Sequence, residues 1–306
     1  MQLFGGIEAG GTKVVCMVGY DPENVLAEER FPTTTPEETI NRVANFFSPY
    51  TKNGTLVAVG IASFGPLDLN LNSPTYGYIT TTPKTGWSWV DLGGEIRRKI
   101  TVPVTIDTDV NAAAIGEQYW TPANRSLDPF VYITVGTGIG VGVIVNGYPL
   151  HGLIHPEAGH FLLPHNWERD PFPGVCPYHG DCLEGLASGV SMYRRWGQKP
   201  ENLTDSHSAW DLEADYLSFA IVNFIYAYSP QRIILGGGVA MHTGLLNTIR
   251  FKVKQLLNGY IQSKMLIDRM EDYILAPTLG NRSGGLGAIA MARKLGINRT
   301  QEIMPL

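Results

Sequence analysis

Two stretches of the sequence repeat one pattern, in which a glycine turn joins two apolar strands. The first stretch is L-F-G-G-I-E-A-G-G-T-K-V-V-C-M-V-G-Y, starting at Leu3, and the second is F-V-Y-I-T-V-G-T-G-I-G-V-G-V-I-V-N-G, starting at Phe130. Each stretch opens roughly half of the 306-residue chain. Because an internal duplication decides the architecture before any local feature does, we expect two related halves, each beginning with a glycine hairpin, that face one another across a cleft.

The composition argues against several classes of protein. A net charge of −5, without a Lys/Arg run that is interleaved with aromatic residues, argues against nucleic acid as a partner. The segment from Pro129 to Pro156 carries no charged side chain, but its β-branched residues and its glycines favour buried strands over a membrane-spanning helix. The N-terminus lacks the pattern of a signal peptide, so we expect a cytoplasmic protein with no membrane partner.

The glycine turns indicate phosphate binding. Glycine lets backbone N–H groups approach an anion without a Cβ in the way, and neighbouring hydroxyl and ammonium groups add donors. Neither turn has the spacing of a P-loop or of a dinucleotide-binding fingerprint. A tight hairpin needs glycine in any case, so it is the repetition that favours the functional interpretation. The candidate residues are Gly10, Gly11, Thr12 and Lys13 in the first turn and Gly136, Thr137 and Gly138 in the second.

A third glycine cluster follows a different pattern. Residues 208–229 have the apolar spacing of a helix that stops before Pro230, and R-I-I-L then forms a short buried strand. This strand runs into Gly236, Gly237 and Gly238. Three glycines leave a flat surface without side chains, against which a planar base could lie. A flexible connection between a strand and a helix explains them equally well.

The stretch V-P-V-T-I-D-T-D-V-N-A-A-A-I-G-E contains the candidate catalytic residue. A buried strand is expected over 102–106 and a helix over 110–120, which places polar side chains at the carboxyl end of the strand, where α/β proteins usually bind ligands. A carboxylate there could accept a proton from a hydroxyl group, or it could cap the helix. Thr108 or Asp107 could serve as the cap, which would leave Asp109 free for catalysis.

A cysteine- and histidine-rich segment predicts a metal site. H-P-E-A-G-H is followed by C-P-Y-H-G-D-C, and thiolate and imidazole are the ligands that Zn²⁺ prefers. A loop that holds these residues by chance, or a disulfide, is the alternative, but a disulfide is a poorer interpretation in a reducing cytoplasm. His155 and His165 could replace one of the expected ligands. The expected tetrahedral set is His160, Cys176, His179 and Cys182.

Taken together, these motifs resemble the ROK family (repressor, open reading frame, kinase). E-A-G-G-T-K, D-T-D-V-N-A-A, G-T-G-I-G-V-G, E-A-G-H, the Cys/His loop and L-G-G-G follow the family's order over essentially the whole chain. The segments S-F-G-P-L-D-L and Y-G-Y-I-T-T-T-P-K-T-G-W resemble the bacterial zinc-containing fructokinases of that family. The resemblance implies an α/β protein with the duplicated, ribonuclease-H-like fold of actin-like ATPases, in which two lobes surround an ATP cleft.

The resemblance also implies a reaction and assigns residues to it. Members transfer the γ-phosphate of Mg²⁺-ATP to a sugar hydroxyl, and for this chain the resemblance implies conversion of D-fructose to D-fructose 6-phosphate. Asp109 matches the general base, the two glycine turns match the phosphate loops, and the three consecutive glycines match the adenosine motif. One structural zinc per chain and a homodimer are implied. The expected sugar-binding residues are Thr108, Glu157, His160, Glu184 and Lys84.

Several positions depart from the family's pattern. The cysteine loop is one residue shorter than usual, and His179 replaces a thiolate. Glu8 stands where aspartate is usual, which lengthens the reach of that carboxylate towards magnesium. Thr108 stands where many relatives have asparagine, which favours a ketose as the substrate.

The sequence leaves other activities open and predicts the boundaries of the two lobes. Within the family, a mannokinase, a glucokinase or an N-acetylhexosamine kinase is the alternative. A sugar-responsive regulator is disfavoured, because the first strand begins at Gln2 or Leu3 and leaves no room for a preceding DNA-binding domain. The expected small lobe is 1–119, completed by a C-terminal helix over 284–306, and the large lobe, with the zinc loop and the adenosine motif, is 120–283.

Overall fold

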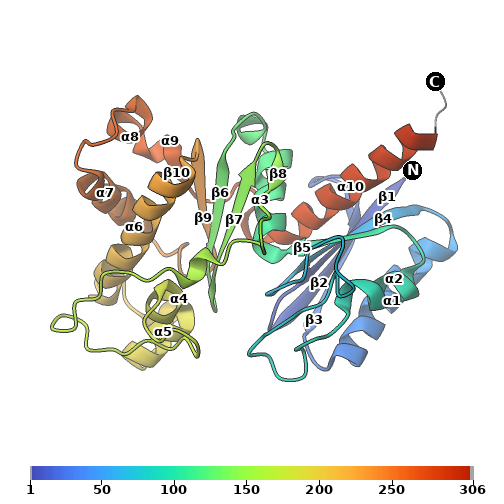
Figure 1. The fold of residues 1–306 in the computed structure, drawn as a ribbon, viewed down its shortest axis with the longest axis horizontal. Coiled ribbons are helices and arrows are strands. Elements are labelled where there is room, and N and C mark those ends of the chain that lie inside the picture. Colours follow the sequence, from blue (N-terminus) through green and yellow to red (C-terminus); the bar gives the residue numbers. More distant parts are fainter. Residues whose placement is uncertain (1, 304–306) are drawn as a thin grey trace. The chain divides into compact units, whose positions relative to one another are not determined.

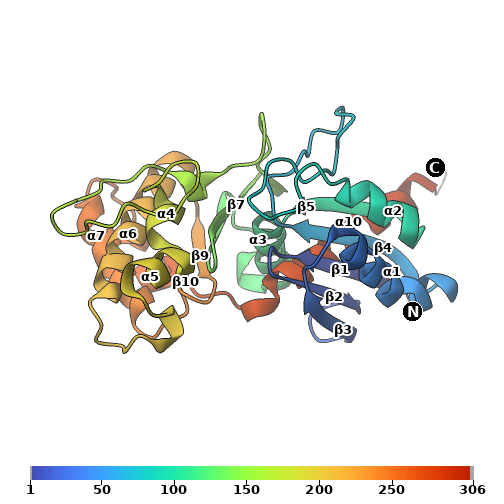
Figure 2. The ribbon, with the colours of Figure 1, turned by 90° about the horizontal axis from the view of Figure 1, so that it is seen from below.

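The computed structural model describes residues 2–303. It divides into two compact units, and each unit is built around its own sheet (Figures 1 and 2). The lobe boundaries expected after residues 119 and 283 stay a prediction. Residues 304–306 of the expected C-terminal helix lie outside the described part of the chain. The first unit comprises the chain up to Ser126, Tyr148–His155 and the chain from Arg282 onward, and the second comprises Leu127–Gly147 and Pro156–Asn281.

The sheet of the first unit has five strands in the order β3-β2-β1-β4-β5. β1 forms an antiparallel hairpin with β2 across the first glycine turn, β2 pairs antiparallel with β3, and β4 and β5 continue the sheet in parallel with β1. The carboxyl ends of three parallel strands therefore lie along one edge of this sheet. The strands are β1 (Leu3–Ala9), β2 (Lys13–Gly19), β3 (Val25–Pro32), β4 (Leu56–Ser63) and β5 (Val104–Thr108).

Helices pack on both faces of this sheet, and two consecutive glycines of β1 bring them close. A Cβ on Gly5 would lie 2.6 Å from the ring of Phe47 in α1, and a Cβ on Gly6 would lie 2.5 Å from the carbonyl oxygen of Gly285 in α10. Neighbouring strand residues point to opposite faces, so α1 covers one face and α10 the other (Figure 1). The helices are α1 (Pro36–Lys52), α2 (Leu92–Ile100), α3 (Asp109–Trp120) and α10 (Ser283–Ile303), with a 3-10 turn η1 (Pro122–Asn124).

The sheet of the second unit repeats the order of the first. It runs β10-β9-β6-β7-β8; β6 and β7 form an antiparallel hairpin, and β9 and β10 continue it in parallel with β6. From β8 to β10, this order corresponds strand by strand to β3, β2, β1, β4 and β5 of the first sheet. The duplication expected from the repeated strand–glycine–strand pattern is confirmed. The strands are β6 (Phe130–Val135), β7 (Ile139–Val145), β8 (Tyr148–Pro149), β9 (Arg232–Gly236) and β10 (Ile274–Leu275). The chain passes from the second unit to the first at β8, so the residues of this end strand are counted with the first unit.

The helices of the second unit include the apolar helix expected over 208–229. This helix is α6, and Ser229 ends it in a left-handed conformation just before Pro230. It packs against α7 and α4 (Figure 2). None of the helices in residues 2–303 combines the length and the apolar character that spanning a membrane requires. The helices are α4 (Leu183–Ala187), α5 (Gly189–Trp196), α6 (Ala209–Tyr228), α7 (Leu245–Leu257), α8 (Lys264–Asp268) and α9 (Met270–Tyr273), with 3-10 turns η2 (Ala158–His160), η3 (Pro200–Asn202) and η4 (Gly280–Arg282).

Candidate functional site

Asp109 lies at the junction of β5 and α3. Thr108 is the residue that caps α3, because its hydroxyl accepts a hydrogen bond from the N–H of Asn111 at 3.1 Å. Asp109 is then the first residue of the helix, one position earlier than the sequence pattern indicated. Since β4 and β5 are parallel neighbours, the Asp109 carboxylate lies at the carboxyl edge of the sheet, where α/β proteins place ligands.

The environment of Asp109 suits it to accept a proton at neutral pH. Burial, with a further contribution from the negative charge of Glu8, raises the pKa of Asp109 to about 7. A general base works best when its pKa is close to the working pH. Glu8 is itself mostly buried, which raises its pKa, and its Oε2 accepts a hydrogen bond from the N–H of Gly285 at 3.1 Å.

The first glycine turn presents backbone to solvent next to these carboxylates. The N–H of Gly10 donates to the carbonyl of Lys13 at 2.9 Å, which closes the turn between β1 and β2. Gly11, Thr12 and Lys13 are exposed, and a Cβ added to Gly11 would meet nothing within 4 Å. The turn therefore leaves room for a ligand against its backbone.

The second glycine turn contacts a residue that was expected to bind sugar. The N–H of Gly136 donates to the carbonyl of Gly138 at 2.9 Å, and Glu184 Oε2 accepts a hydrogen bond from the N–H of Ile139, also at 2.9 Å. A Cβ on Gly138 would lie 2.5 Å from that carboxylate oxygen. The Glu184 carboxylate thus lies directly against Gly138, and the structure brings these two expected site residues together.

The three glycines after β9 have different roles. Gly237 has a φ of +93°, and a Cβ there would lie 2.3 Å from the carbonyl oxygen of Val135. Glycine is therefore required at this position by the fold. A Cβ on Gly238 would meet nothing within 4 Å, so the backbone there is open. The adenosine-binding role of Gly236 to Gly238 stays a prediction.

The four expected metal ligands form one cluster. The ligand atoms of His160, Cys176, His179 and Cys182 all lie within 4.8 Å of one another. His160 Nδ1 lies 3.4 Å from Cys182 Sγ and 3.7 Å from Cys176 Sγ, and His179 Nδ1 lies 3.6 Å from Cys176 Sγ. Tetrahedral Zn²⁺ with bonds of about 2.0–2.3 Å separates its ligand atoms by about 3.3–3.8 Å, so these four residues fit the ion.

The two cysteines of the cluster do not form a disulfide, and His155 and His165, the alternative zinc ligands, make other contacts. Cys176 and Cys182 are both free thiols. His155 Nε2 accepts a hydrogen bond from the N–H of Leu67 at 3.1 Å. His165 Nδ1 lies 3.0 Å from a carboxylate oxygen of Asp181. The set of four is therefore complete without them, and because His160 faces the cluster through Nδ1, its Nε2 remains for another partner.

Backbone geometry shapes the metal loop and connects it to α4. Gly180 has a φ of +61° and exchanges two backbone hydrogen bonds with Cys176, at 3.0 and 3.2 Å. A Cβ on Gly185 would lie 1.9 Å from the Gly180 carbonyl oxygen, so the loop lies directly against α4. Cys182 is the residue before this helix, and Glu184 lies in its first turn. The loop that holds the cluster therefore also sets the position of Glu184.

Glu157 and Lys84 are the remaining residues that we expect to bind the sugar. Glu157 precedes η2, and its carbonyl accepts the N–H of His160 at 3.0 Å. Lys84 lies in the connection between β4 and α2, where its carbonyl accepts the N–H of Trp87 at 3.2 Å. No described contact joins Lys84 to the other expected site residues.

One residue near Asp109 was not expected from the sequence. His151 Nε2 lies 3.1 Å from a carboxylate oxygen of Asp107, two positions before Asp109. This contact raises the pKa of His151. The two residues are 44 positions apart, and no motif connects them. In the sequence, the only indication of this contact is His151 itself, which follows β8 and precedes a glycine.

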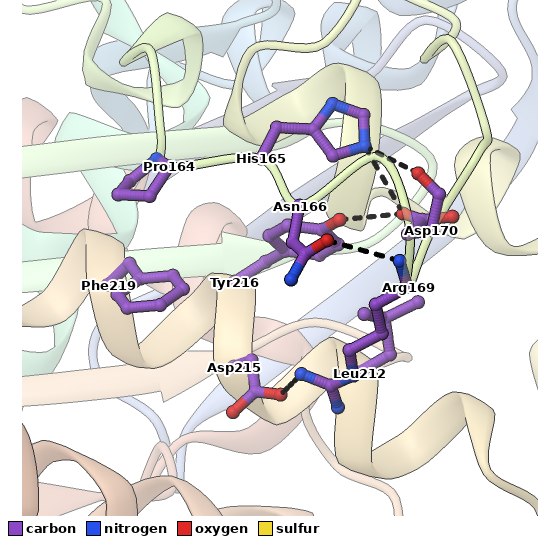
Figure 3. A pocket seen from close by; sticks show the side chains of 9 residues that line it. All are labelled: Pro164, His165, Asn166, Arg169, Asp170, Leu212, Asp215, Tyr216 and Phe219. Carbon is purple, nitrogen blue, oxygen red and sulfur yellow. Dashed lines mark hydrogen bonds and ion pairs between the residues drawn. The ribbon is translucent and has the colours of Figure 1, made fainter.

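A separate cavity of about 290 Å³ lies in the second unit, next to the segment that leads to the metal loop (Figure 3). Arg169 and Asp215, which both line it, form an ion pair, and the buried Asp170 accepts a hydrogen bond from Tyr216 at 2.6 Å. The cavity contains none of the expected catalytic, phosphate-binding or metal residues. Its lining residues are Pro164, His165, Asn166, Arg169, Asp170, Leu212, Asp215, Tyr216 and Phe219.

Comparison with known proteins identifies the family. The model of the ROK family matches residues 4–295. A putative fructokinase of Bacillus subtilis is 44% identical over 292 residues, which cover 95% of this chain and 96% of that protein. A fructokinase of Streptococcus mutans is 43% identical over 297 residues, which cover 96% and 98%. The chain belongs to the ROK family.

Solved structures share the architecture. A ROK hexokinase from Thermus thermophilus superposes with a TM-score of 0.78 at 24% identity, over 97% of this chain and 100% of that one. A ROK family glucokinase from Streptomyces griseus, in complex with glucose and AMPPNP, gives 0.73 at 24% identity, over 95% and 99%. The expected fold, two α/β lobes of the actin-like ATPase type, is confirmed.

Proposed function

We propose that the chain is a fructokinase, which transfers the γ-phosphate of MgATP to D-fructose and releases D-fructose 6-phosphate and ADP. Five relatives named as fructokinases, one of them a putative fructokinase, are 40–44% identical to it over about 95% of its length, whereas two glucokinases are 26% identical. This difference supports fructose over glucose as the acceptor.

The observation that carries the proposed chemistry is the position and environment of Asp109. Its carboxylate lies at the carboxyl edge of the first sheet, with a pKa raised to about 7 by burial and by Glu8. In the proposed reaction, Asp109 takes the proton from the primary hydroxyl of the sugar while that oxygen attacks the γ-phosphorus, and ADP leaves with the electron pair of the broken P–O bond. A base positioned in this way contributes about 10²–10⁴-fold to the rate.

The glycine turns supply what phosphoryl transfer needs besides a base. This reaction depends on positioning and on neutralising charge more than on covalent chemistry, and Mg²⁺ bound with ATP neutralises phosphate oxygens. The exposed backbone of Gly11 and Thr12, with the nearby ammonium of Lys13, would bind phosphate oxygens in the first unit. Gly136 to Gly138 would do so in the second, and Gly236 to Gly238 would lie against the adenosine.

The sugar-binding assignments follow from how the metal loop is built. The four cluster residues would hold Zn²⁺, which when bound fixes the loop without taking part in phosphoryl transfer. His160 faces the cluster through Nδ1, which commits Nε2–H to donating a hydrogen bond, here to a sugar hydroxyl. Glu157 and Glu184 would accept hydrogen bonds from other hydroxyls. Thr108 and Lys84 would bias the pocket towards a ketose.

The proposal includes a cytoplasmic homodimer. The proposed reaction needs ATP, which the cytoplasm contains, and this supports the location. The family resemblance supports the dimer, and light scattering at several protein concentrations tests it. A monomer at micromolar concentration would exclude the dimer and leave the proposed reaction unaffected.

The test is ADP release with MgATP and each of five sugars: fructose, mannose, glucose, N-acetylglucosamine and N-acetylmannosamine, with a blank that lacks sugar. We expect fructose to give a kcat/KM at least about tenfold above the others, which corresponds to about 1.4 kcal/mol of transition-state discrimination. If another sugar gave the highest kcat/KM, the protein would be a sugar kinase but not a fructokinase. Well-folded protein that releases no sugar-dependent ADP would contradict the proposed function.

A further inference from the structure

The segment Tyr148–His155 belongs to the first unit and carries two histidines, four positions apart, for which neither the metal site nor the proposed reaction has a use. Each histidine contacts a different loop of that unit. His151 contacts Asp107, at the end of β5, and His155 contacts Leu67, in the connection that follows β4. One short segment therefore holds two loops that are distant in sequence.

The first contact fixes the turn that leads into α3. Asp107 is buried, and one of its carboxylate oxygens accepts hydrogen bonds from the N–H of Thr108 and from the side-chain amide of Asn111, both at 2.7 Å. The other oxygen lies 3.1 Å from His151 Nε2. A buried carboxylate costs free energy unless donors surround it. His151 supplies the third donor to this carboxylate, which is itself bonded to Thr108 and Asn111 on either side of Asp109.

The second contact fixes the loop after β4. The imidazole of His155 is buried, and its Nε2 accepts the N–H of Leu67 at 3.1 Å, so Nδ1 carries the proton of the neutral ring. A Cβ on Gly65 would lie 3.6 Å from His155 Cε1, so the ring lies against this loop. The loop is further closed by the N–H of Thr80, which donates to the carbonyl of Pro66 at 2.8 Å.

The two contacts involve segments that follow neighbouring strands of the first sheet. In the parallel pair β4–β5, Ser63 is opposite Thr108, so the chain leaves both strands next to Asp109. His155 is also the last residue of its segment in the first unit, and Glu157 and His160, the proposed sugar-binding residues, follow within five positions. The same stretch of chain thus continues from the neighbourhood of the proposed base to the residues proposed to hold the sugar.

We propose that His151 and His155 are positioning residues for the reaction: His151 aligns Asp109 through Asp107, and His155 holds the loop after β4 in the conformation that sugar binding requires. This inference rests on the proposed function. It requires no contact of either histidine with substrate. Its energetic basis is orientation, since a misplacement of about 1 Å in a catalytic group can cost about 10²-fold in rate.

His151 is tested by a pair of variants. His151→Phe fills the space without a donor at the same place, whereas His151→Gln retains an N–H group that can reach Asp107. We expect kcat to fall about tenfold in His151→Phe, with the KM values for ATP and sugar within about twofold of wild type, and to recover most of its value in His151→Gln. A kcat that stays within twofold in His151→Phe, or that falls equally in both variants, overturns the role of His151.

His155 is tested by His155→Leu against His155→Gln, which can still accept the Leu67 N–H. We expect the amide of Leu67 to exchange with solvent at least about tenfold faster in His155→Leu, and the KM for the sugar to rise by a similar factor, with both effects smaller in His155→Gln. Unchanged exchange at Leu67 together with an unchanged sugar KM in His155→Leu overturns the role of His155.

The matched control is His207→Leu. His207 also accepts a backbone N–H, that of Ala209 at 3.1 Å, but it lies at the start of α6 in the second unit. We expect its kinetic constants to equal those of wild type, and losses as large as those of the His151 and His155 variants would overturn the inference. Inactive wild-type protein overturns the proposed function and the inference together, whereas active wild-type protein with unaffected variants overturns the inference alone.

Discussion

Glu8 Oε2 accepts a hydrogen bond from the N–H of Gly285 at 3.1 Å, which ties the end of β1 to the first turn of α10. A Cβ on Gly284 would lie 2.8 Å from Glu8 Cδ, so the glycine at this position makes room for the carboxylate. A carboxylate is favoured at the amino end of a helix. The Glu8 side chain is therefore accommodated by α10, and its negative charge also acts on Asp109.

Replacing Glu8 with glutamine should shift the pH dependence of the reaction. Asp109 must be ionised to act as a base, so kcat/KM of the wild type should rise with pH through a midpoint of about 7 and then level off. Glu8→Gln can still accept the Gly285 N–H but removes a negative charge that raises the pKa of Asp109. The midpoint should move to lower pH. The control is Glu37→Gln, at the exposed start of α1, and an identical midpoint in Glu8→Gln and wild type would exclude the coupling.

Asp109→Asn should remove most of the turnover. The amide cannot take a proton from the sugar hydroxyl, so kcat should fall by about 10²–10⁴-fold. Binding of the sugar, measured by calorimetry without ATP, should change little because the side chain keeps its size. Turnover within tenfold of wild type would remove Asp109 from the mechanism.

The same variant should be more stable than the wild type, and the difference should grow with pH. The pKa of Asp109 is raised from 3.8 to about 7 in the folded protein. The folded state therefore binds this proton more tightly than the unfolded state, and stability is lost as the pH rises from about 4 to about 7. Asparagine does not titrate. The gain in Tm of Asp109→Asn over wild type should be small at pH 4.5 and largest at pH 8, and the opposite order would contradict the assigned pKa.

Local patterns in the sequence were sufficient to predict much of the fold. The repeated strand–glycine–strand unit predicted the two related sheets because a hairpin and its turn are contiguous in the chain. Thr108 was one of two possible caps for α3, and only the hydrogen bond to Asn111 decides between them. The four metal ligands lie within 23 positions of one another in the sequence, and the structure gathers them in one cluster.

Long-range polar contacts could not be predicted from the sequence. His151 meets Asp107 across 44 positions and His155 meets Leu67 across 88. No periodicity or spacing rule connects such pairs, because their encounter depends on how β8 leads the chain back to the first sheet. From the sequence alone His155 is therefore a possible zinc ligand, whereas in the structure its Nε2 accepts the Leu67 N–H.

The cluster of four ligands predicts stoichiometric zinc. Cys182→Ser removes a thiolate from a Cys₂His₂ set, and we expect it to lose the metal and to raise the KM for the sugar, since Cys182 immediately precedes the helix of Glu184. Elemental analysis of dialysed protein measures the first effect and steady-state kinetics the second. Cys16→Ser is the control, because Cys16 lies in the core of the first unit. It should keep one zinc per chain. Native protein without zinc would contradict the prediction.

Glu213 should destabilise the protein at neutral pH. The residue is 1% exposed in α6, and neither carboxylate oxygen has a hydrogen-bond partner within the described part of the chain. Burial raises its pKa well above 4.5, and the charge of Arg195 offsets only part of this effect. The folded state holds the proton that the unfolded state releases, so each pH unit between the unfolded and the folded pKa costs about 1.4 kcal/mol of stability.

Glu213→Gln removes this titration while keeping the shape of the side chain. We expect its Tm to equal that of the wild type near pH 4 and to exceed it increasingly up to pH 8, as measured by thermal unfolding at fixed ionic strength. Glu201→Gln, on an exposed side chain of η3, is the control and should match the wild type at every pH. A Glu213→Gln variant that is less stable than the wild type at pH 8 would contradict this prediction. It would show that the carboxylate is ionised and paired with Arg195 in the folded protein, because only then would the amide remove a favourable charge interaction.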